Sequence, residues 1–172
     1  CGITDFKEIE LANKLGIDVI IVDHHEVQEK MPRAVSIVNP CQKEEKYPFK
    51  ELAAGGVAFK LAQALLKNSK LVEGLEKWLL DLVAIATVTD SMPLKGENRT
   101  LVKYGLVVLA QTKRFGLQEL MRMAGIKPIL NQKLFITNLD THTLGYILGP
   151  RLNAAGRMDH ANDAYRLLIT KS

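Results

Sequence analysis

The chain has 172 residues, of which 47% are hydrophobic and 24% are charged, with 12 Gly, 6 Pro and 2 Cys. This apolar content can bury a core, which excludes a disordered chain, and the Gly and Pro content excludes collagen-like and low-complexity classes. Two Cys exclude a disulfide scaffold and indicate a reducing, cytoplasmic location. No apolar run approaches the roughly 20 residues of a membrane span. The start, Cys-Gly-Ile-Thr, has neither Met nor a basic-then-apolar leader, so we expect no signal peptide and a piece of a longer protein.

The net charge of +4 is distributed unevenly along the chain. Residues 1–94 carry 11 Lys and Arg against 14 Asp and Glu, a net −3, whereas residues 95–172 carry 12 against 5, a net +7. A basic half that faces a phosphate-bearing partner explains this difference. An ordinary solvated surface with uneven charge explains it equally well.

The first part of the chain predicts a helix followed by parallel strands. Thr4 or Asp5 can begin a helix, and Gly16 suits its end. Residues 17–22 form a β-branched run without alternation, which is typical of a parallel strand buried on both faces. Residues 34–38 predict a second short strand, ended by Asn-Pro.

The rest of the chain predicts mainly helices. We expect a polar loop over 41–50, helices over 51–67 and 71–89, a helix capped by Asn98 and running to about 114, helices over 117–124 and 138–147, a loop over 149–157 and a last helix over 160–169. The chain is therefore predicted to be one helix-rich α/β domain. Its sheet portion covers about 1–50 and its mainly helical portion about 51–172.

Asp23-His24-His25 follow the first predicted strand at its carboxyl end, where open α/β sheets bind ligands. Imidazole nitrogens and carboxylate oxygens together suit Mn²⁺, Zn²⁺ or Fe²⁺ better than Ca²⁺. Adjacent side chains on an extended segment point in opposite directions, so we expect one His to be a ligand, the other to face substrate, and Asp23 to orient the site. Polar loop residues without a metal role fit the tripeptide equally well.

Asp90 ends the apolar helix predicted over 71–89. A carboxylate at the C-terminus of a helix is unfavourable with the helix dipole, and a metal ion would compensate for it. An exposed Asp that begins a turn before Ser91-Met92-Pro93 is an equally good interpretation.

Residues 149–157 read GPRLNAAGR, so that Arg151 and Arg157 bracket small residues and Asn153. Backbone amides and guanidinium groups can approach a phosphate closely in such a segment. A tight structural loop with two solvent-facing Arg is the alternative. The density of Gly, Ala and Arg favours phosphate contact.

Taken together, these motifs resemble the RecJ family of the DHH phosphoesterase superfamily. The resemblance runs from residue 1 to about 170, with the motifs in family order. It is carried by Val22-Asp23-His24-His25, by DLVAIATVTD over 81–90, by Pro93-Leu94 followed by Asn98-Arg99, and by GPRLNAAGR over 149–157. It implies an α/β fold with a parallel sheet and flanking helices. It also implies a 5′→3′ exonuclease that hydrolyses phosphodiester bonds of single-stranded DNA in DNA repair and recombination.

The resemblance also implies roles for individual residues. His24 and Asp90 correspond to metal ligands, His25 to a catalytic position near the scissile phosphate, and Asp23 to the acid that orients it. Two Mn²⁺ or Mg²⁺ ions would bind the phosphodiester and activate water. Residues expected to hold the DNA phosphates are His25, Arg151, Asn153 and Arg157. Single-stranded DNA is the implied partner, together with single-strand-binding and helicase proteins and without a membrane.

The chain also departs from the family pattern. An upstream motif resembling Asp-x-Asp-x-Asp-Gly is absent, and a further family Asp would come just before Cys1-Gly2-Ile3. The downstream DHHA1-type domain and any OB-type module are missing as well. We therefore expect truncated N-terminal strands and a chain that is inactive alone.

Two other functions remain open at this point. One is a DHH-family phosphodiesterase that acts on cyclic dinucleotides or short oligoribonucleotides. The other is a non-catalytic binding module with the DHH fold.

Overall fold

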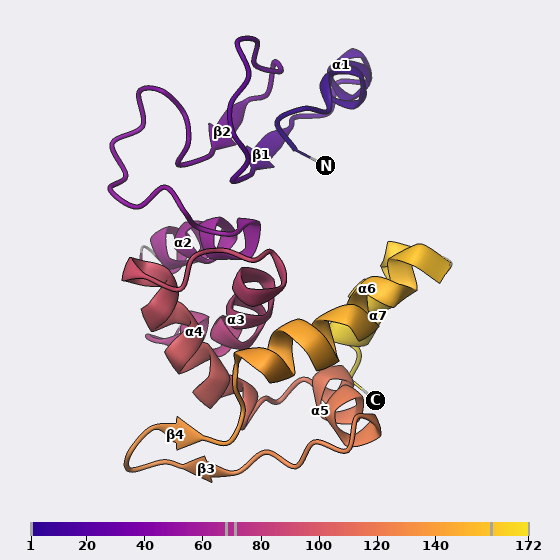
Figure 1. Cartoon of the computed structure of the whole chain (residues 1–172). Helices are drawn as coiled ribbons and strands as arrows, with labels where there is room; N and C mark the ends of the chain where they lie inside the picture. The colour runs from indigo at the N-terminus through magenta and orange to yellow at the C-terminus, as the bar shows by residue number, and fades with distance from the viewer. Residues whose placement is uncertain (1, 68, 71, 159, 172) are drawn as a thin grey trace.

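The computed structural model describes residues 2–67, 69–70, 72–158 and 160–171 (Figure 1). Its elements in chain order are α1 (Phe6–Lys14), β1 (Ile20–Val22), β2 (Ser36–Val38), α2 (Ala54–Lys67), the 3-10 helix η1 (Leu75–Leu79), α3 (Leu80–Thr89), α4 (Gly96–Leu109), α5 (Phe115–Met123), β3 (Leu130–Asn131), β4 (Ile136–Thr137), the π-helix η2 (Thr143–Leu148), α6 (Gly149–Met158) and α7 (Ala161–Ile169). This is the predicted α/β fold with a small parallel sheet and flanking helices. No described helix is long and apolar enough to span a bilayer.

The parallel sheet is formed by β1 and β2, with Ile20 opposite Ser36 and Val22 opposite Val38. Both strands lie within the predicted segments, but each has only three residues. The prediction that residues 17–22 are buried on both faces is wrong, because the side chains of Ile17 and Ile20 are more than half exposed. In the described part of the chain β1 pairs with β2 alone, so that its second edge has no strand partner.

The helical part is built around α3. This helix is apolar on nearly all sides, and it is surrounded by α2, α4 and η2. Gly105 lets α4 approach α3 closely, since a Cβ at this position would collide with the Leu80 carbonyl and the Ala84 side chain. The largest buried cluster joins α3, α4, α5 and η2 and consists of Ala84, Ile85, Leu109, Leu117, Met121, Leu139, Leu144 and Leu148.

A second apolar cluster fixes the sheet against the helices. Its buried members are Leu52, Val57, Phe59, Leu80, Val83 and Leu101. Val22 and Val38, the last residues of the two strands, pack against this cluster. The residues that follow β1 are therefore held beside α2 and α3.

Several helix boundaries differ from the prediction: α2 begins at Ala54 and not at 51, and α4 ends at Leu109 and not near 114. The helix expected over 71–89 begins as η1 and becomes α-helical only at Leu80, because Gly74 precedes η1 with a left-handed φ of 82°. Position 71 lies outside the described residues. Asn98 does not cap α4, which has Lys95 at its N-cap. Instead the Asn98 side chain is fully buried within the first turn of α4.

The loop expected over 149–157 is helix α6, which continues directly from η2. Pro150 lies inside this continuous helical stretch, directly after the π-helical segment η2, and the Leu, Ala and Arg residues that follow are good helix formers. Gly149 is needed for packing, because a Cβ there would collide with the Thr89 side chain. The helix expected over 138–147 begins only at residue 141 and continues through η2 into α6. The hairpin of β3 and β4 was not predicted, since its strands have two residues each.

Candidate metal and phosphate site

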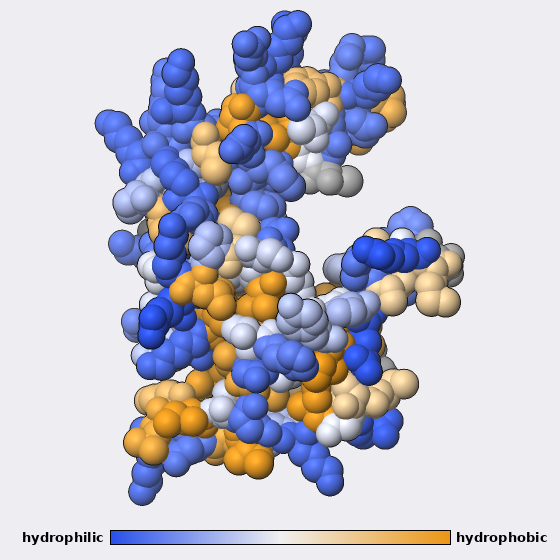
Figure 2. Space-filling view, viewed as in Figure 1, coloured by the Kyte–Doolittle hydropathy of each residue, from blue (hydrophilic) through white to orange (hydrophobic). Residues whose placement is uncertain are grey.

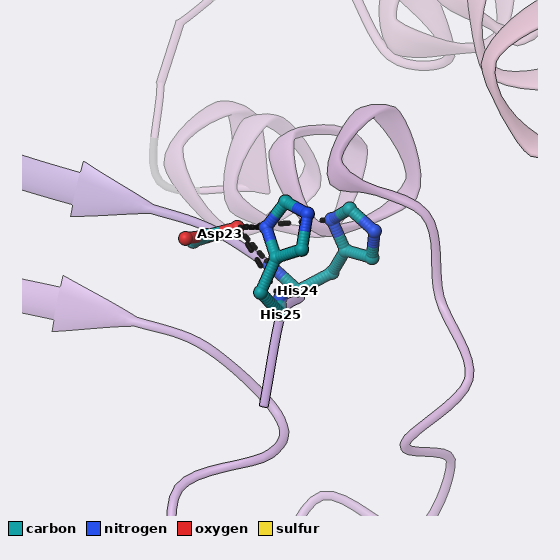
Figure 3. A group of neighbouring side chains, drawn as sticks. All are labelled: Asp23, His24 and His25. Carbon is teal, nitrogen blue, oxygen red and sulfur yellow. Dashed lines mark hydrogen bonds and ion pairs between the residues drawn. The ribbon is translucent and has the colours of Figure 1, made fainter. Parts of the chain in front are cut away.

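The polar tripeptide Asp23-His24-His25 leaves the sheet directly after β1 (Figure 3). The imidazole rings of His24 and His25 lie side by side, with their centroids 4.3 Å apart and their planes inclined by 38°. The expectation that the two rings point in opposite directions is therefore wrong. The strand ends at Val22, and the chain bends at His25, so the alternation of a strand does not extend to the histidines.

Asp23 organises this bend through both oxygens of its buried carboxylate. Oδ1 accepts hydrogen bonds from the backbone N–H groups of His24 (2.7 Å) and His25 (3.3 Å) and lies 2.7 Å from Nδ1 of the His25 ring. Oδ2 accepts from the backbone N–H of Ile3 at 2.8 Å. Burial alone would raise the pKa of Asp23, but the hydrogen bonds from Ile3, His25 and His24 outweigh it and lower the pKa to about 2. Asp23 is therefore an anion at neutral pH.

His24 meets Asp90 across the site. The His24 Nε2 atom lies 2.8 Å from Asp90 Oδ2, although 65 residues separate the two in sequence. The two side chains that correspond to metal ligands by family resemblance therefore converge in the structure. Asp90 ends α3, and Ser91 follows it with a left-handed φ of 56°, so the chain turns away and leaves the carboxylate partly exposed.

The donor atoms around His24 fit a divalent cation. Two ligand atoms about 2.1 Å from one ion and at right angles to each other lie about 3 Å apart, which matches the spacing of the His24 and Asp90 atoms. The other ring nitrogen, His24 Nδ1, is buried and has no hydrogen-bond partner within the described residues. Asp23, His24 and His25 also offer ligand atoms that all lie within 4.8 Å of one another. A mixed nitrogen and carboxylate set of this kind suits Mn²⁺, and its carboxylates also suit Mg²⁺.

Asp90 also lies at the wall of a cleft of about 770 Å³. The cleft is formed by the start of α2, the end of α3, η2 and α6. In Figure 2 the surface is hollowed between the N-terminal part and the outer end of α6 and α7. Much of the wall consists of small side chains, which leave room for a ligand: Ala53, Ala54, Gly55, Ala86, Gly145, Gly149 and Ala154.

Helix α6 divides the residues of the GPRLNAAGR motif between two faces. Asn153 and Arg157 line the cleft together with Asp90, because residues four apart lie on one face of a helix. Arg151 precedes Asn153 by two residues and does not line the cleft. Its guanidinium instead donates a hydrogen bond to the Ile147 carbonyl at 2.7 Å. The two arginines expected to hold phosphate therefore differ in the structure, because Arg157 lines the cleft and Arg151 does not.

Sequence reasoning missed two parts of the site. One is the start of α2, where Ala53, Ala54 and Gly55 form part of the cleft. The close Gly55-Gly56 pair was the available signal, because glycine marks positions where another group approaches. The other is the segment after β2, in which Asn39 donates a hydrogen bond to the His25 carbonyl and Cys41 donates one to the His24 carbonyl.

Known proteins resemble this chain over almost its whole length. A family model described as DHH family, N-terminal domain, matches residues 1–87. The chain is 44% identical over 170 residues to the single-stranded-DNA-specific exonuclease RecJ of Bacillus subtilis (strain 168), covering 99% of this chain and 20% of that protein. It is 37% identical over 179 residues to RecJ of Escherichia coli (strain K12), covering 98% of this chain and 30% of that protein. The chain thus spans less than a third of the length of these relatives.

Solved structures of RecJ proteins also resemble this chain over almost its whole length. A crystal structure of exonuclease RecJ bound to manganese superimposes with a TM-score of 0.80 at 32% identity, covering 98% of this chain and 40% of that chain. The structure of RecJ from Thermus thermophilus in complex with Mn²⁺ also gives a TM-score of 0.80 at 32% identity, covering 100% of this chain and 24% of that chain. Because the family match spans half of the chain and includes the strand that carries Asp23-His24-His25, the chain belongs to the DHH family.

Proposed function

We propose that this chain is part of a metal-dependent exonuclease that hydrolyses the phosphodiester bonds of single-stranded DNA from the 5′ end, in DNA repair and recombination in the cytoplasm. The observation that carries the proposal is the contact between His24 and Asp90 at the wall of a cleft that also contains Arg157. Two further findings support the proposal. The relatives of the chain are named single-stranded-DNA-specific exonucleases, which supports the substrate. The similar RecJ structures contain manganese or magnesium, which supports the ions.

In this proposal His24 and Asp90 hold a divalent ion. Bound Mn²⁺ or Mg²⁺ supplies Lewis-acid polarisation of a phosphoryl oxygen and lowers the pKa of water. Asp90 provides negative charge, and His24, which is only 12% exposed, provides a nitrogen ligand. A second ion needs further carboxylates, which the longer protein would supply.

His25 is proposed to contact the phosphate. Its Nδ1 pairs with Asp23 Oδ1 at 2.7 Å, which fixes the orientation of the ring and leaves Nε2 at the other side. The ring is 69% exposed and so remains accessible to a substrate. The Asp23 carboxylate can only accept at this contact, so it fixes the ring tautomer with the proton on Nδ1 and leaves Nε2 free to face the phosphate.

The DNA backbone is proposed to follow the cleft. Arg157 and Asn153 offer donors for phosphate oxygens from one wall, and the N-terminus of α2 offers the positive end of a helix dipole from the other. Arg151 lies on another face of α6 with its guanidinium on the Ile147 carbonyl, and it is proposed to contribute less to DNA binding than Arg157. The net +7 of residues 95–172 favours such a partner.

The test is a nuclease assay with the full-length protein and its Asp90→Asn variant. Single-stranded DNA labelled at the 5′ or 3′ end is incubated with Mn²⁺, and a cyclic dinucleotide serves as the competing substrate. We expect release of mononucleotides from the 5′ end, at least 100-fold slower for Asp90→Asn, since a metal ligand is removed. Preferential cleavage of the cyclic dinucleotide supports the small-substrate phosphodiesterase instead. DNA binding without cleavage of either substrate supports a non-catalytic module.

A further inference from the structure

We propose that Asn39 is a positioning residue that holds the histidine pair in its metal-binding conformation. This inference rests on the proposed metal-dependent function and adds a residue outside the DHH tripeptide. Asn39 follows β2 and is 2% exposed, so its amide is sequestered from solvent. The Asn39 side chain forms hydrogen bonds with the backbone of His25 and of Cys41.

The side chain of Asn39 uses both ends of its amide. Nδ2 donates a hydrogen bond to the His25 carbonyl at 2.9 Å. Oδ1 accepts one from the backbone N–H of Cys41 at 2.8 Å. This second bond fixes Cys41, whose Sγ in turn donates to the His24 carbonyl at 3.4 Å. One short segment therefore holds the carbonyl groups of both histidines.

The sheet explains why such a segment is needed. The backbone N–H of Asp23 still donates to the Val38 carbonyl at 3.0 Å, and the strand pairing ends there. Beyond this point the backbone groups of the two histidines need other partners, because unpaired buried backbone groups are costly. Since β1 and β2 are parallel, residues 39–41 leave the sheet at the same edge as the histidines.

All four backbone polar groups of the histidine pair are bound in this way. Asp23 Oδ1 accepts from the N–H groups of His24 and His25. Cys41 and Asn39 donate to the two carbonyls. The backbone is thus fixed from both sides, and this brings the two rings together at a centroid distance of 4.3 Å. If the segment from Asn39 to Cys41 moves, the ring nitrogens of the histidines move with it.

Asparagine suits this position because one short side chain must donate and accept at once. An ionised Asp cannot donate to the His25 carbonyl, and Gln is longer by one methylene. Ala removes both hydrogen bonds without adding charge. An Asp variant would place an additional anion near the cation and obscure the result, so Asn39→Ala is the appropriate change.

The chain contains a matched control in Asn138. Its Oδ1 accepts from the Ile129 N–H at 2.7 Å, and its Nδ2 donates to the Lys127 carbonyl at 3.0 Å. Asn138 thus accepts and donates one hydrogen bond each, as Asn39 does, and it directly follows β4 as Asn39 follows β2. The hairpin of β3 and β4 lies at the opposite end of the molecule from β1 and β2 (Figure 1). Asn138→Ala therefore tests the loss of the same pair of hydrogen bonds at an exposed position away from the site.

The experiment measures Mn²⁺ affinity of the full-length protein by electron paramagnetic resonance, for wild type, Asn39→Ala and Asn138→Ala. We expect the dissociation constant for Mn²⁺ to rise about 10- to 100-fold in Asn39→Ala, as for other residues that orient metal ligands, and to remain unchanged in Asn138→Ala. Both variants should melt at a lower temperature than wild type. In the nuclease assay, added Mn²⁺ should restore Asn39→Ala, which a purely structural defect does not predict.

An unchanged Mn²⁺ affinity of folded Asn39→Ala overturns the positioning role while leaving the proposed nuclease function intact. Absence of Mn²⁺ binding by the wild type overturns both. If Asn39→Ala does not fold, Cys41→Ala provides the test, because it removes the thiol that lies 3.4 Å from the His24 carbonyl and 3.5 Å from the Lys50 carbonyl and leaves both hydrogen bonds of Asn39 in place. A smaller but measurable loss of Mn²⁺ affinity is then expected, and no loss contradicts the proposal.

Discussion

Gly2 lies directly against the carboxylate of Asp23. A Cβ built on Gly2 would overlap Asp23 Oδ2, the oxygen that accepts the hydrogen bond from the Ile3 N–H. The absence of a side chain at Gly2 is therefore what allows this segment to reach the buried Asp23. The same carboxylate holds the ring of His25, so the packing of Gly2 is linked to the geometry of the site.

We expect Gly2→Ala to displace the Asp23 carboxylate and to lower the free energy of unfolding by about 1–3 kcal/mol, as in other overpacked interiors. Nuclease activity should fall as well, because the orientation of His25 depends on Asp23. Thermal melting and a nuclease assay on the full-length protein measure both effects. Gly156→Ala is the control for stability, since its Cβ would meet the nearest atom only at 3.7 Å. Equal stability of the two variants would contradict the proposed packing.

Protonation of Asp23 should make stability depend on pH. Its pKa is about 2 in the folded chain, against an ordinary value of 3.8, so the folded state favours the carboxylate. The stabilisation is present above about pH 4 and is lost as the pH falls from about 4 to 2, with a magnitude on the order of 2 kcal/mol. The free energy of unfolding is measured with urea at pH 6 and pH 3 without metal. It should fall less between these two pH values for Asp23→Asn than for wild type. An identical decrease in the free energy of unfolding in both proteins would exclude Asp23 as the source of the pH dependence.

The 172-residue chain alone should bind Mn²⁺ weakly and have little nuclease activity. Two divalent ions carry four positive charges, and the carboxylates that lie nearest His24 among the described residues belong to Asp23 and Asp90. Comparing Mn²⁺ binding and single-stranded DNA hydrolysis by the isolated chain and the full-length protein tests this. Robust Mn²⁺-dependent degradation by the isolated chain would show that these residues suffice for the site.

Elements with a strong local signal could be predicted from the sequence. The helices at Phe6–Lys14 and Ala161–Ile169 agree with their apolar periodicity, and Gly16 follows the first with the expected left-handed φ of 71°. The parallel strand ends directly before Asp23, as the β-branched run predicts. In contrast, the contact between His24 and Asp90 follows only from family resemblance, because a separation of 65 residues contains no local geometric information.

The failures of prediction have a common physical cause, since tertiary packing overrode local rules. Gly149-Pro150 predicts a loop by composition, but η2 leads directly into α6 and Gly149 packs against Thr89. Strand alternation predicts the histidine rings on opposite sides, but the Asp23 carboxylate accepts a hydrogen bond from the His25 N–H and Asn39 donates one to the His25 carbonyl, and these contacts impose a bend. Sequence periodicity alone predicts neither the packing of Gly149 against Thr89 nor the hydrogen bonds to the histidine backbone.

The two arginines of helix α6 should differ in their effect on DNA binding. Arg157 lines the cleft with Asp90, whereas the guanidinium of Arg151 binds the Ile147 carbonyl. Arg122, which pairs with Glu119 on α5, is the control arginine. Each phosphate contact on a single strand contributes about 0.7 to the slope of log K against log salt concentration.

We expect Arg157→Ala to reduce this slope by about 0.7 and leave Mn²⁺ affinity nearly unchanged, because guanidinium groups bind phosphate while His24 and Asp90 bind the ion. Arg151→Ala should change the slope less and lower the melting temperature more, since it removes a hydrogen bond within the fold. Arg157→Lys should restore only part of the affinity, because an ammonium cannot reproduce a bidentate contact. An Arg157→Ala slope equal to that of Arg122→Ala would contradict a phosphate contact and limit Arg157 to a structural role on α6.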